Sequence, residues 1–479
     1  MNSKIIKNAG WLFSGQAIGR ALRAVLIIFA ARTLGTSDWG VFSYALSLAA
    51  AFTVFSDIGI NALLVREGSR NADLRSKYLS TGLVIKLALL SALGLFAFLA
   101  KDFIVRIPEA IYLIPLIIII FTLDSLRDFV SALARSFERM DIEAKGQVIT
   151  NIGIVGFGLL FLAINPNSTS LAIGYAIGTF IGLLAVFLPL RSYFRGIIKG
   201  FSKKLIKEII FSAWPFGLIS LMGVIVVNTD VIVLGSVGSA SDVGLYTSAQ
   251  KPVQILYLIP SLLAASFFPT LSREAWEKSK FRRTLEQGLK SVYFFAAPLA
   301  VGGALTAKPL VQLLYGSEFI PAFESFAFLS LTFLFVFPSI FFTNALFAQN
   351  SQKSFYGYLF VGIVLNVILD LILIPRFGIA GCAIATLVVQ QALFIYGALK
   401  LGKILPFSIF PKVGRICVAT FLMAGIVLYL LSLSVHVLIV IAIGMLVYIL
   451  SLLAFGEPIF EAIYMALRKK PGITSGVEM

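Results

Sequence analysis

Apolar segments of about 20 residues recur along the whole chain, and each is long enough to cross roughly 30 Å of hydrocarbon. They are continuously apolar instead of alternating, so they predict helices and exclude barrel strands. Hydrophobic residues make up 59% of the chain and charged residues only 13%, a balance typical of an all-α polytopic membrane protein. We predict about fourteen transmembrane helices, at 10–33, 40–65, 78–100, 111–134, 147–164, 170–190, 209–235, 243–271, 289–307, 323–348, 355–375, 379–400, 413–432 and 435–455.

The basic residues indicate how the chain is oriented in the membrane. Alternate loops are rich in Lys and Arg, and the loop 191–208 is the richest of them. The opposite loops carry only Arg32, Lys101, Arg106, Lys308 and Arg376. By the positive-inside rule, this bias predicts a multi-pass protein of the cell membrane with both termini in the cytoplasm. The net charge of +16 is then topogenic, and we expect contacts with membrane lipids and none with nucleic acid.

An internal repeat divides the chain. The segment "GTSDWGVFSYA" at 35–45 is echoed by "SASDVGLYTSA" at 239–249, and "GYAIGT" at 174–179 by "GCAIAT" at 381–386. The spacing equals six spans, so the two halves share one orientation and predict two six-helix bundles in a parallel pseudo-repeat. We therefore predict an N-terminal bundle at 1–195, an amphipathic cytoplasmic linker at 196–208, a C-terminal bundle at 209–402, and two further helices with a cytoplasmic tail at 403–479.

The opening stretch "NAGWLFSGQAIGRALRAVLIIFAARTLGTSDWGVFSYALSLAAAFTVFSDIGINALLVRE" resembles that of Wzx-type flippases, which translocate O-antigen and exopolysaccharide precursors. These proteins belong to the multidrug/oligosaccharidyl-lipid/polysaccharide exporter superfamily. The resemblance implies a flippase that moves a polyprenyl-linked glycan from the cytoplasmic to the outer leaflet by alternating access. It also implies a protein that could work beside other glycan-assembly proteins, and we expect a monomer.

Several charges lie inside the predicted spans, where each costs at least about 2.5–3.5 kcal/mol and should face a partner or a water-filled cavity. Arg20 and Arg23 are three residues apart and share a helix face. Arginine matches phosphate oxygens with a fork of donors. We predict that a cavity for the lipid pyrophosphate is lined by Arg20, Arg23, Lys86, Arg127 and Lys251, although Asp124 and Asp128 offer Arg127 local partners. The alternative is that these charges only neutralise one another in pairs between helices.

A second polar set lies in the C-terminal half. Asp230 and Asp370 both lie about 7 Å below the outer end of their spans, and Thr386 about 10 Å below it. Asn366 shares a helix face with Asp370, and the Cys382 carbonyl lies nearby. Such oxygen atoms suit a hard monovalent cation or a proton. The aligned positions of the other half are Leu26 or Ile27, Phe157, Phe161 and Thr179, so the acidic set is an addition to one half.

This set is similar to the sodium site of MurJ-type lipid II flippases, where an Asp, an Asn-x-x-x-Asp pair, a Thr and a backbone carbonyl surround the ion. The similarity implies a cation site at Asp230, Asn366, Asp370, Cys382 and Thr386, with coupling to Na⁺ or H⁺ and no other cofactor. The alternative to this site is a buried polar network that only joins three helices.

Enzyme functions are disfavoured by short outer loops that carry few charges. The sequence has no G-x-x-x-x-G-K-[ST] motif, so direct use of ATP is unsupported. Two transport alternatives stay open: a MATE-like cation-coupled multidrug antiporter and a MurJ-like lipid II flippase. An antiporter for cationic drugs would be expected to have an acidic cavity, whereas the first bundle here is rich in Arg and Lys.

Overall fold

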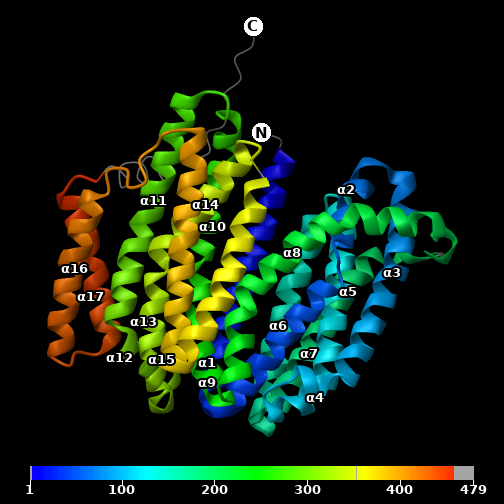
Figure 1. The fold of residues 1–479 in the computed structure, drawn as a ribbon, viewed down its shortest axis with the longest axis horizontal. Coiled ribbons are helices and arrows are strands. Elements are labelled where there is room, and N and C mark those ends of the chain that lie inside the picture. The colour runs from blue at the N-terminus through cyan, green and yellow to red at the C-terminus, as the bar shows by residue number, and fades with distance from the viewer. Residues whose placement is uncertain (1–2, 196, 352, 458–479) are drawn as a thin grey trace, which may run out of the picture. The chain divides into compact units, whose positions relative to one another are not determined.

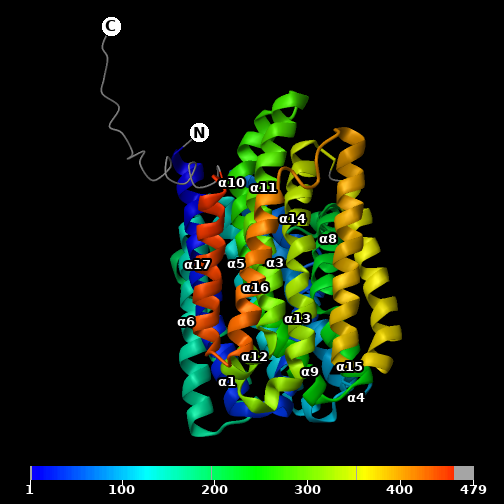
Figure 2. The ribbon, with the colours of Figure 1, turned by 90° about the vertical axis from the view of Figure 1, so that its left-hand side faces the viewer.

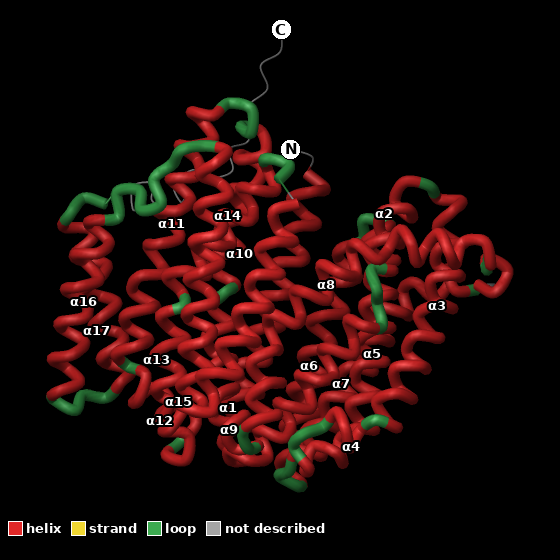
Figure 3. The backbone as a smooth tube through the Cα atoms, in the orientation of Figure 1, coloured by secondary structure: helices red, strands yellow, loops and turns green. Residues whose placement is uncertain are grey.

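The computed structural model describes residues 3–195, 197–351 and 353–457. Every regular element in these ranges is a helix (Figure 3), so the prediction of an all-helical chain is confirmed for them. The predicted cytoplasmic tail falls largely on 458–479, outside the described residues.

The elements follow one another along the chain as labelled in Figure 1. The α-helices are α1 (Ser3–Phe55), α2 (Ile60–Arg70), α3 (Ala72–Leu99), α4 (Lys101–Ile104), α5 (Ile114–Ser136), α6 (Met140–Ile164), α7 (Ser168–Leu190), α8 (Lys203–Val237), α9 (Ala240–Leu256), α10 (Leu258–Arg273), α11 (Lys278–Leu305), α12 (Ala307–Tyr315), α13 (Phe323–Leu331), α14 (Phe333–Ala348), α15 (Lys353–Ile404), α16 (Gly414–Ser432) and α17 (Val437–Ala454). The 3₁₀ helices are η1 (Pro108–Leu113), η2 (Arg191–Phe194), η3 (Ile197–Gly200) and η4 (Ser317–Ala322).

Within the described residues, 11 helical segments are long and apolar enough to cross a membrane. The count reaches 12 when Ser14–Phe55 and Ile60–Arg70, which are bent by 44°, are taken as one span. This count supports a multi-pass membrane protein, and the predicted number of fourteen spans stays a prediction.

Two of the longest helices change direction at a glycine. α1 leaves helical geometry at Gly35 (φ 72°, ψ −178°) and α15 at Gly378 (φ 56°, ψ −136°), backbone conformations that glycine adopts without a steric penalty. A Cβ on Gly362 would lie 3.2 Å from the Leu393 side chain, whereas a continuous helix would hold these residues about 46 Å apart. The two legs of α15 are therefore antiparallel neighbours, in yellow and orange in Figure 2.

The chain packs as two compact units. The first contains Met1–Leu258, Val311–Leu329 and Gln352–Leu393, and the second contains Ile259–Leu310, Ser330–Ser351 and Phe394–Met479. All the predicted site residues belong to the first unit. These units follow from packing, whereas the predicted domain boundaries follow from the sequence repeat, so those boundaries stay a prediction. α8 begins at Lys203, which makes the end of the predicted linker continuous with the following helix.

In the first unit, α1 and α9 meet at two glycines. A Cβ on Gly40 would lie 1.7 Å from the Ala240 carbonyl oxygen, and a Cβ on Gly244 would lie 1.9 Å from that of Thr36. The Ser241 hydroxyl also donates to the Thr36 hydroxyl at 2.9 Å. Because residues 36 and 40 correspond to 240 and 244 in the sequence repeat, the contact is reciprocal, as a two-fold relation between repeats would make it.

The second unit is held together mainly by apolar packing. α16 and α17 lie side by side (Figure 2), and the Tyr448 hydroxyl of α17 donates to the Phe294 carbonyl of α11 at 2.8 Å. A Cβ on Gly288 would lie 2.0 Å from the Phe341 ring of α14, so α11 and α14 pack closely at that point.

Candidate functional site

The five residues predicted as a cation site converge in the first unit. Asp230 comes from α8, Asn366 and Asp370 from the first leg of α15, and Cys382 and Thr386 from its second leg. Asp230 and Asn366 are each 3% exposed, and Asp370 and Cys382 are fully buried. The fold-back of α15 brings the residues before and after Gly378 to one place beside α8.

Asp230 is the centre of the hydrogen bonds in this pocket. The Thr386 hydroxyl donates to Asp230 Oδ2 at 2.9 Å and also lies 3.1 Å from the Cys382 carbonyl oxygen. The Asn366 side chain is within hydrogen-bonding reach of the Asp230 carboxylate. Asp370 interacts electrostatically with Asp230 and faces the Cys382 thiol. Asp230 and Asp370 therefore lie in one pocket, while their depth in the membrane stays a prediction.

Two residues of α9 also contribute to the pocket, and neither was predicted from the sequence. The Tyr246 hydroxyl donates to Asp230 Oδ2 at 2.5 Å and lies 3.2 Å from the Thr386 hydroxyl. Gln250 Nε2 lies 3.4 Å from the same carboxylate oxygen. Tyr246 and Gln250 are four residues apart and share a helix face. Their spacing of four residues inside a predicted span was the signal that pointed to them.

The pocket holds an excess of buried acceptor atoms. Asp230 Oδ1, Gln250 Oε1, Asn366 Oδ1 and both carboxylate oxygens of Asp370 are buried and accept no hydrogen bond of normal geometry. Buried oxygen atoms without a donor are costly, and two neighbouring carboxylates repel each other. A hard cation such as Na⁺ would be bound by these oxygen atoms and would also reduce the repulsion between the two carboxylates. No group of three or more His, Cys, Asp or Glu in the described ranges is arranged to hold a metal ion.

Three of the predicted cavity cations lie together on α1 and α9. Arg20 interacts electrostatically with Arg23, and Arg23 with Lys251. Arg23 Nε donates to Asn151 Oδ1 of α6 at 2.6 Å, and its guanidinium lies 5.9 Å from the centre of the Tyr175 ring of α7. Arg20 and Lys251 make no ion pair with any carboxylate of the described residues. We call Arg20, Arg23 and Lys251 the cationic cluster.

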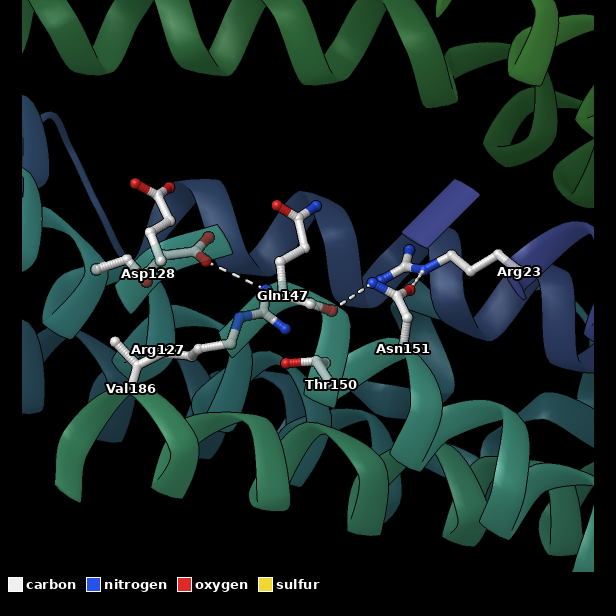
Figure 4. Close-up of a pocket in the computed structure, with 9 residues that line it drawn as sticks. Arg23, Arg127, Asp128, Gln147, Thr150, Asn151 and Val186 are labelled. Atoms are coloured by element: carbon white, nitrogen blue, oxygen red, sulfur yellow. Dashed lines mark hydrogen bonds and ion pairs between the residues drawn. The ribbon is translucent and has the colours of Figure 1, made fainter. Parts of the chain in front are cut away.

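Arg127 lies on α5 and has the local partners that the sequence suggested. Its guanidinium is 2.7 Å from Asp124 Oδ1 and 3.1 Å from Asp128 Oδ1. Arg127 and Arg23 nevertheless line the same cavity of about 90 Å³. Figure 4 shows Gln147 between them, with its amide directed away from α6.

One face of α6 contributes half of the polar residues that line this cavity. Glu143, Gln147 and Asn151 are spaced four residues apart, so they follow one helix face, and Thr150 lies beside them. This polar stripe was not predicted from the sequence, because Gln147, Thr150 and Asn151 carry no charge and Glu143 precedes the predicted span 147–164.

Of the predicted cavity cations, Arg20, Lys86 and Lys251 are not among the residues that line this cavity, and Lys86 has partners of its own. Its ammonium group is fully buried, 3.0 Å from Asp57 Oδ1 and 3.3 Å from Asn61 Oδ1, and 5.7 Å from the centre of the Phe129 ring. The Asp57 carboxylate also accepts the backbone N–H of Asn61 at 3.2 Å, so the ion pair stabilises the break between α1 and α2.

The fold is that of a polytopic membrane protein, and one of its two units contains both the cationic cluster and the acidic pocket. The chain belongs to the family described as "Polysaccharide biosynthesis protein", whose model matches residues 5–274, and this confirms the resemblance seen in the opening sequence. It is 24% identical to the "Probable low-salt glycan biosynthesis flippase Agl15" of Haloferax volcanii, over 95% of this chain and 97% of that one.

A bacterial relative and a solved structure agree with this assignment. The chain is 24% identical to the "Putative O-antigen transporter" of Shigella flexneri, over 66% of this chain and 78% of the relative. A structure of lipid II flippase MurJ in an inward closed conformation superposes with a TM-score of 0.76 at 20% identity, and covers 96% of this chain and 100% of that one. That likeness shows the fold. The chain is therefore a membrane transport protein of the flippase class and not an enzyme.

Proposed function

We propose that this protein moves a polyprenyl-(pyro)phosphate-linked oligosaccharide from the cytoplasmic to the outer leaflet by alternating access, coupled to a monovalent cation. One observation carries the proposal: Arg20, Arg23 and Lys251 gather in the same packed unit as a pocket of donor-free acceptor oxygens. An anionic substrate and a small cation are the two ligands that these opposite sites would take.

The cationic cluster suits a phosphate or pyrophosphate group. Arg23 is oriented by Asn151 and Tyr175, so part of its rotamer entropy is already lost before a ligand arrives. Arginine binds phosphate oxygens in pairs, and charge-assisted bonds are about twice as strong as neutral ones. The polar stripe of α6 lies beside Arg23 and offers carboxylate and amide groups to sugar hydroxyls.

The acidic pocket suits the coupling ion. Asp230, Asn366, Asp370 and Thr386 would provide side-chain oxygens and Cys382 its carbonyl, and Na⁺ and H⁺ are both candidates. The three positive charges of the cationic cluster distinguish this function from that of an antiporter for cationic drugs, because the cluster would repel a cationic drug.

The membrane arrangement that fits this function has fourteen crossings, with α1 and α15 each crossing twice because both turn at a glycine. The basic loops favour the cell membrane and cytoplasmic termini. Two six-helix bundles, 1–195 and 209–402, would rock about the site. We expect a monomer in contact with membrane lipids and, in the cell, with other glycan-assembly proteins.

The test is leaflet-resolved labelling of the lipid-linked glycan after depletion of the protein. Accumulation in the cytoplasmic leaflet supports the flippase, whereas an unchanged leaflet distribution with altered dye efflux would overturn it. The coupling is tested in proteoliposomes with Asp370→Asn: transport whose dependence on Na⁺ and pH is unchanged would remove the coupling ion while leaving the flippase intact.

A further inference from the structure

Helix α9 has two functional faces. Tyr246 and Gln250 contact the acidic pocket, and Gly244 and Lys251 face α1. Each residue of a helix is rotated by about 100° about the helix axis. Relative to Gly244, Tyr246 and Gln250 are therefore rotated by about 200° and 240° and lie on the far side of the helix, whereas Lys251 lies within about 20° of Gly244. The same helix therefore lies between the acidic pocket and α1.

The face toward the acidic pocket is adapted to its charge. Asp230 Oδ2 already accepts from Tyr246 and Thr386, while Asp230 Oδ1 and Gln250 Oε1 have no donor. Acceptor oxygens repel one another in a dry pocket, and a cation would draw them together. Gln250 is a neutral oxygen ligand available from α9, outside the five residues predicted from the sequence.

The opposite face is packed so closely that it cannot absorb a movement of the helix. A Cβ on Gly244 would lie 3.1 Å from Gly40 N as well as 1.9 Å from the Thr36 carbonyl oxygen. Lys251, about 10 Å further along α9, interacts electrostatically with Arg23 of the cationic cluster. A shift of α9 toward the acidic pocket would therefore loosen the contact with α1 and change the spacing of the cluster.

The part of α9 that precedes Pro252 is suited to move as one piece. α9 runs from Ala240 to Leu256 with Pro252 inside it, and it begins with a capping box, in which Ser239 and Asp242 satisfy each other's backbone N–H groups. A capped helix of this kind keeps its first turn intact, so a displacement at Gln250 is transmitted to Ser241 and Gly244.

We propose that Gln250, as a further cation ligand, and Tyr246, as a positioning residue, couple cation binding at Asp230 and Asp370 to the α1–α9 contact. The inference rests on the proposed cation coupling and adds its transmission route. A bound cation draws Gln250 toward Asp230, moves α9 away from α1, and weakens the contact between Thr36 and Ser241. The substrate cluster responds because Lys251 moves with the same helix.

The experiment measures this contact by disulfide formation. Thr36→Cys and Ser241→Cys replace the two hydroxyls that lie 2.9 Å apart, in full-length protein in proteoliposomes that also carries Cys417→Ala, while the buried Cys382 is kept. Na⁺ in place of choline should slow disulfide formation by about ten-fold, within the usual range of couplings between sites. Gln250→Leu and Tyr246→Phe should each abolish the difference between the two salts.

Ser248→Ala is the matched control. Ser248 is buried on the same helix, and its hydroxyl donates only to the Leu245 carbonyl one turn earlier, at 2.7 Å. This variant should keep the full Na⁺ response. If it loses the response as Gln250→Leu does, the effect comes from a general weakening of α9, and the inference is overturned.

Direct binding of ²²Na⁺ to the purified protein separates this inference from the proposal on which it rests. If Asp370→Asn abolishes Na⁺ binding and Gln250→Leu weakens it by about ten-fold, the result supports both the cation site and the inference about α9. Normal binding and a normal Na⁺ response in Gln250→Leu and Tyr246→Phe overturn the inference but leave the cation site in place. If the wild-type protein binds no Na⁺, the inference fails together with Na⁺ coupling, while the leaflet assay still decides the flippase function.

Discussion

The acidic pocket and its counterpart in the sequence repeat have opposite chemistry. Tyr246 and Gln250 of α9 correspond, 204 residues earlier, to Phe42 and Leu46 on α1. Those two line an apolar pocket of about 10 Å³ with Ala45, Ala49, Leu113, Ile117, Ile120 and Ala172. Phe42 lies against Tyr175, with ring centres 6.2 Å apart.

The same replacement extends to the rest of the pocket. At the same offset of 204 residues, Asp230 corresponds to Leu26, which is 6% exposed. The Leu26 side chain packs against Gly158, where an added Cβ would lie 3.1 Å from it. Thr179, the counterpart of Thr386, donates to the Tyr175 carbonyl within its own helix at 2.9 Å. An apolar cluster at this position is enough for the fold. Two carboxylates in its place raise the cost of folding, and this indicates that they serve a function.

The largest expected effect comes from removing one carboxylate. Asp370→Asn should weaken Na⁺ binding by at least about 100-fold, since it removes a charged ligand from a buried site. ²²Na⁺ binding to the purified protein measures it. The matched variant in the other half, Phe161→Leu, should leave Na⁺ binding unchanged. Equal losses of Na⁺ binding in both variants would contradict a cation site in the acidic pocket.

Neutralising the cationic cluster should have the next largest effect. Arg20→Ala and Arg23→Ala should each lower glycan translocation by about ten-fold, because a hydrogen bond to a charged group contributes about 1.5–3 kcal/mol. The assay is leaflet-resolved labelling in cells with matched protein levels. Arg376→Ala, an exposed cation of α15, is the control and should retain full activity. Translocation that survives both arginine changes would contradict an anion site at α1.

At the glycine contact between α1 and α9, equivalent substitutions in the two halves should destabilise the protein equally. Gly40→Ala and Gly244→Ala should each destabilise the protein by about 2 kcal/mol, since the new methyl group overlaps a carbonyl oxygen across the contact. Thermal unfolding in detergent measures both. Gly156→Ala is the control, because a Cβ there meets no atom within 4 Å. A large loss in only one of the two contact variants would show that the contact is not equivalent in the two halves.

The smallest effect is expected where the apolar counterpart is made polar. Phe42→Tyr places a hydroxyl where Tyr246 has one, but no carboxylate corresponds to Asp230. The buried hydroxyl should cost about 1 kcal/mol and should create no affinity for Na⁺. Unfolding and ²²Na⁺ binding check these two expectations, and Na⁺ affinity gained by this single change would contradict the asymmetry.

Short-range features were predictable from the sequence. The apolar spans, the face shared by Asn366 and Asp370, and the pairing of Arg127 with Asp124 all follow from helix length and period. The matching depths of Asp230 and Asp370 follow from a rise of about 1.5 Å per residue. These properties belong to one helix at a time, or to two helices counted from the same membrane surface.

The identity of the neighbouring helix was decided only by the tertiary structure. Counting along the chain could not show that α9 brings Tyr246 and Gln250 to Asp230. It also could not show that the Lys86 ammonium group binds Asp57 and Asn61, whereas Lys251 interacts electrostatically with Arg23. Helical period determines the face and depth of a side chain, but which helix covers that face depends on how closely the backbones approach. Here that approach is set by paired glycines such as Gly40 and Gly244, whose role appears only when the helices are packed together.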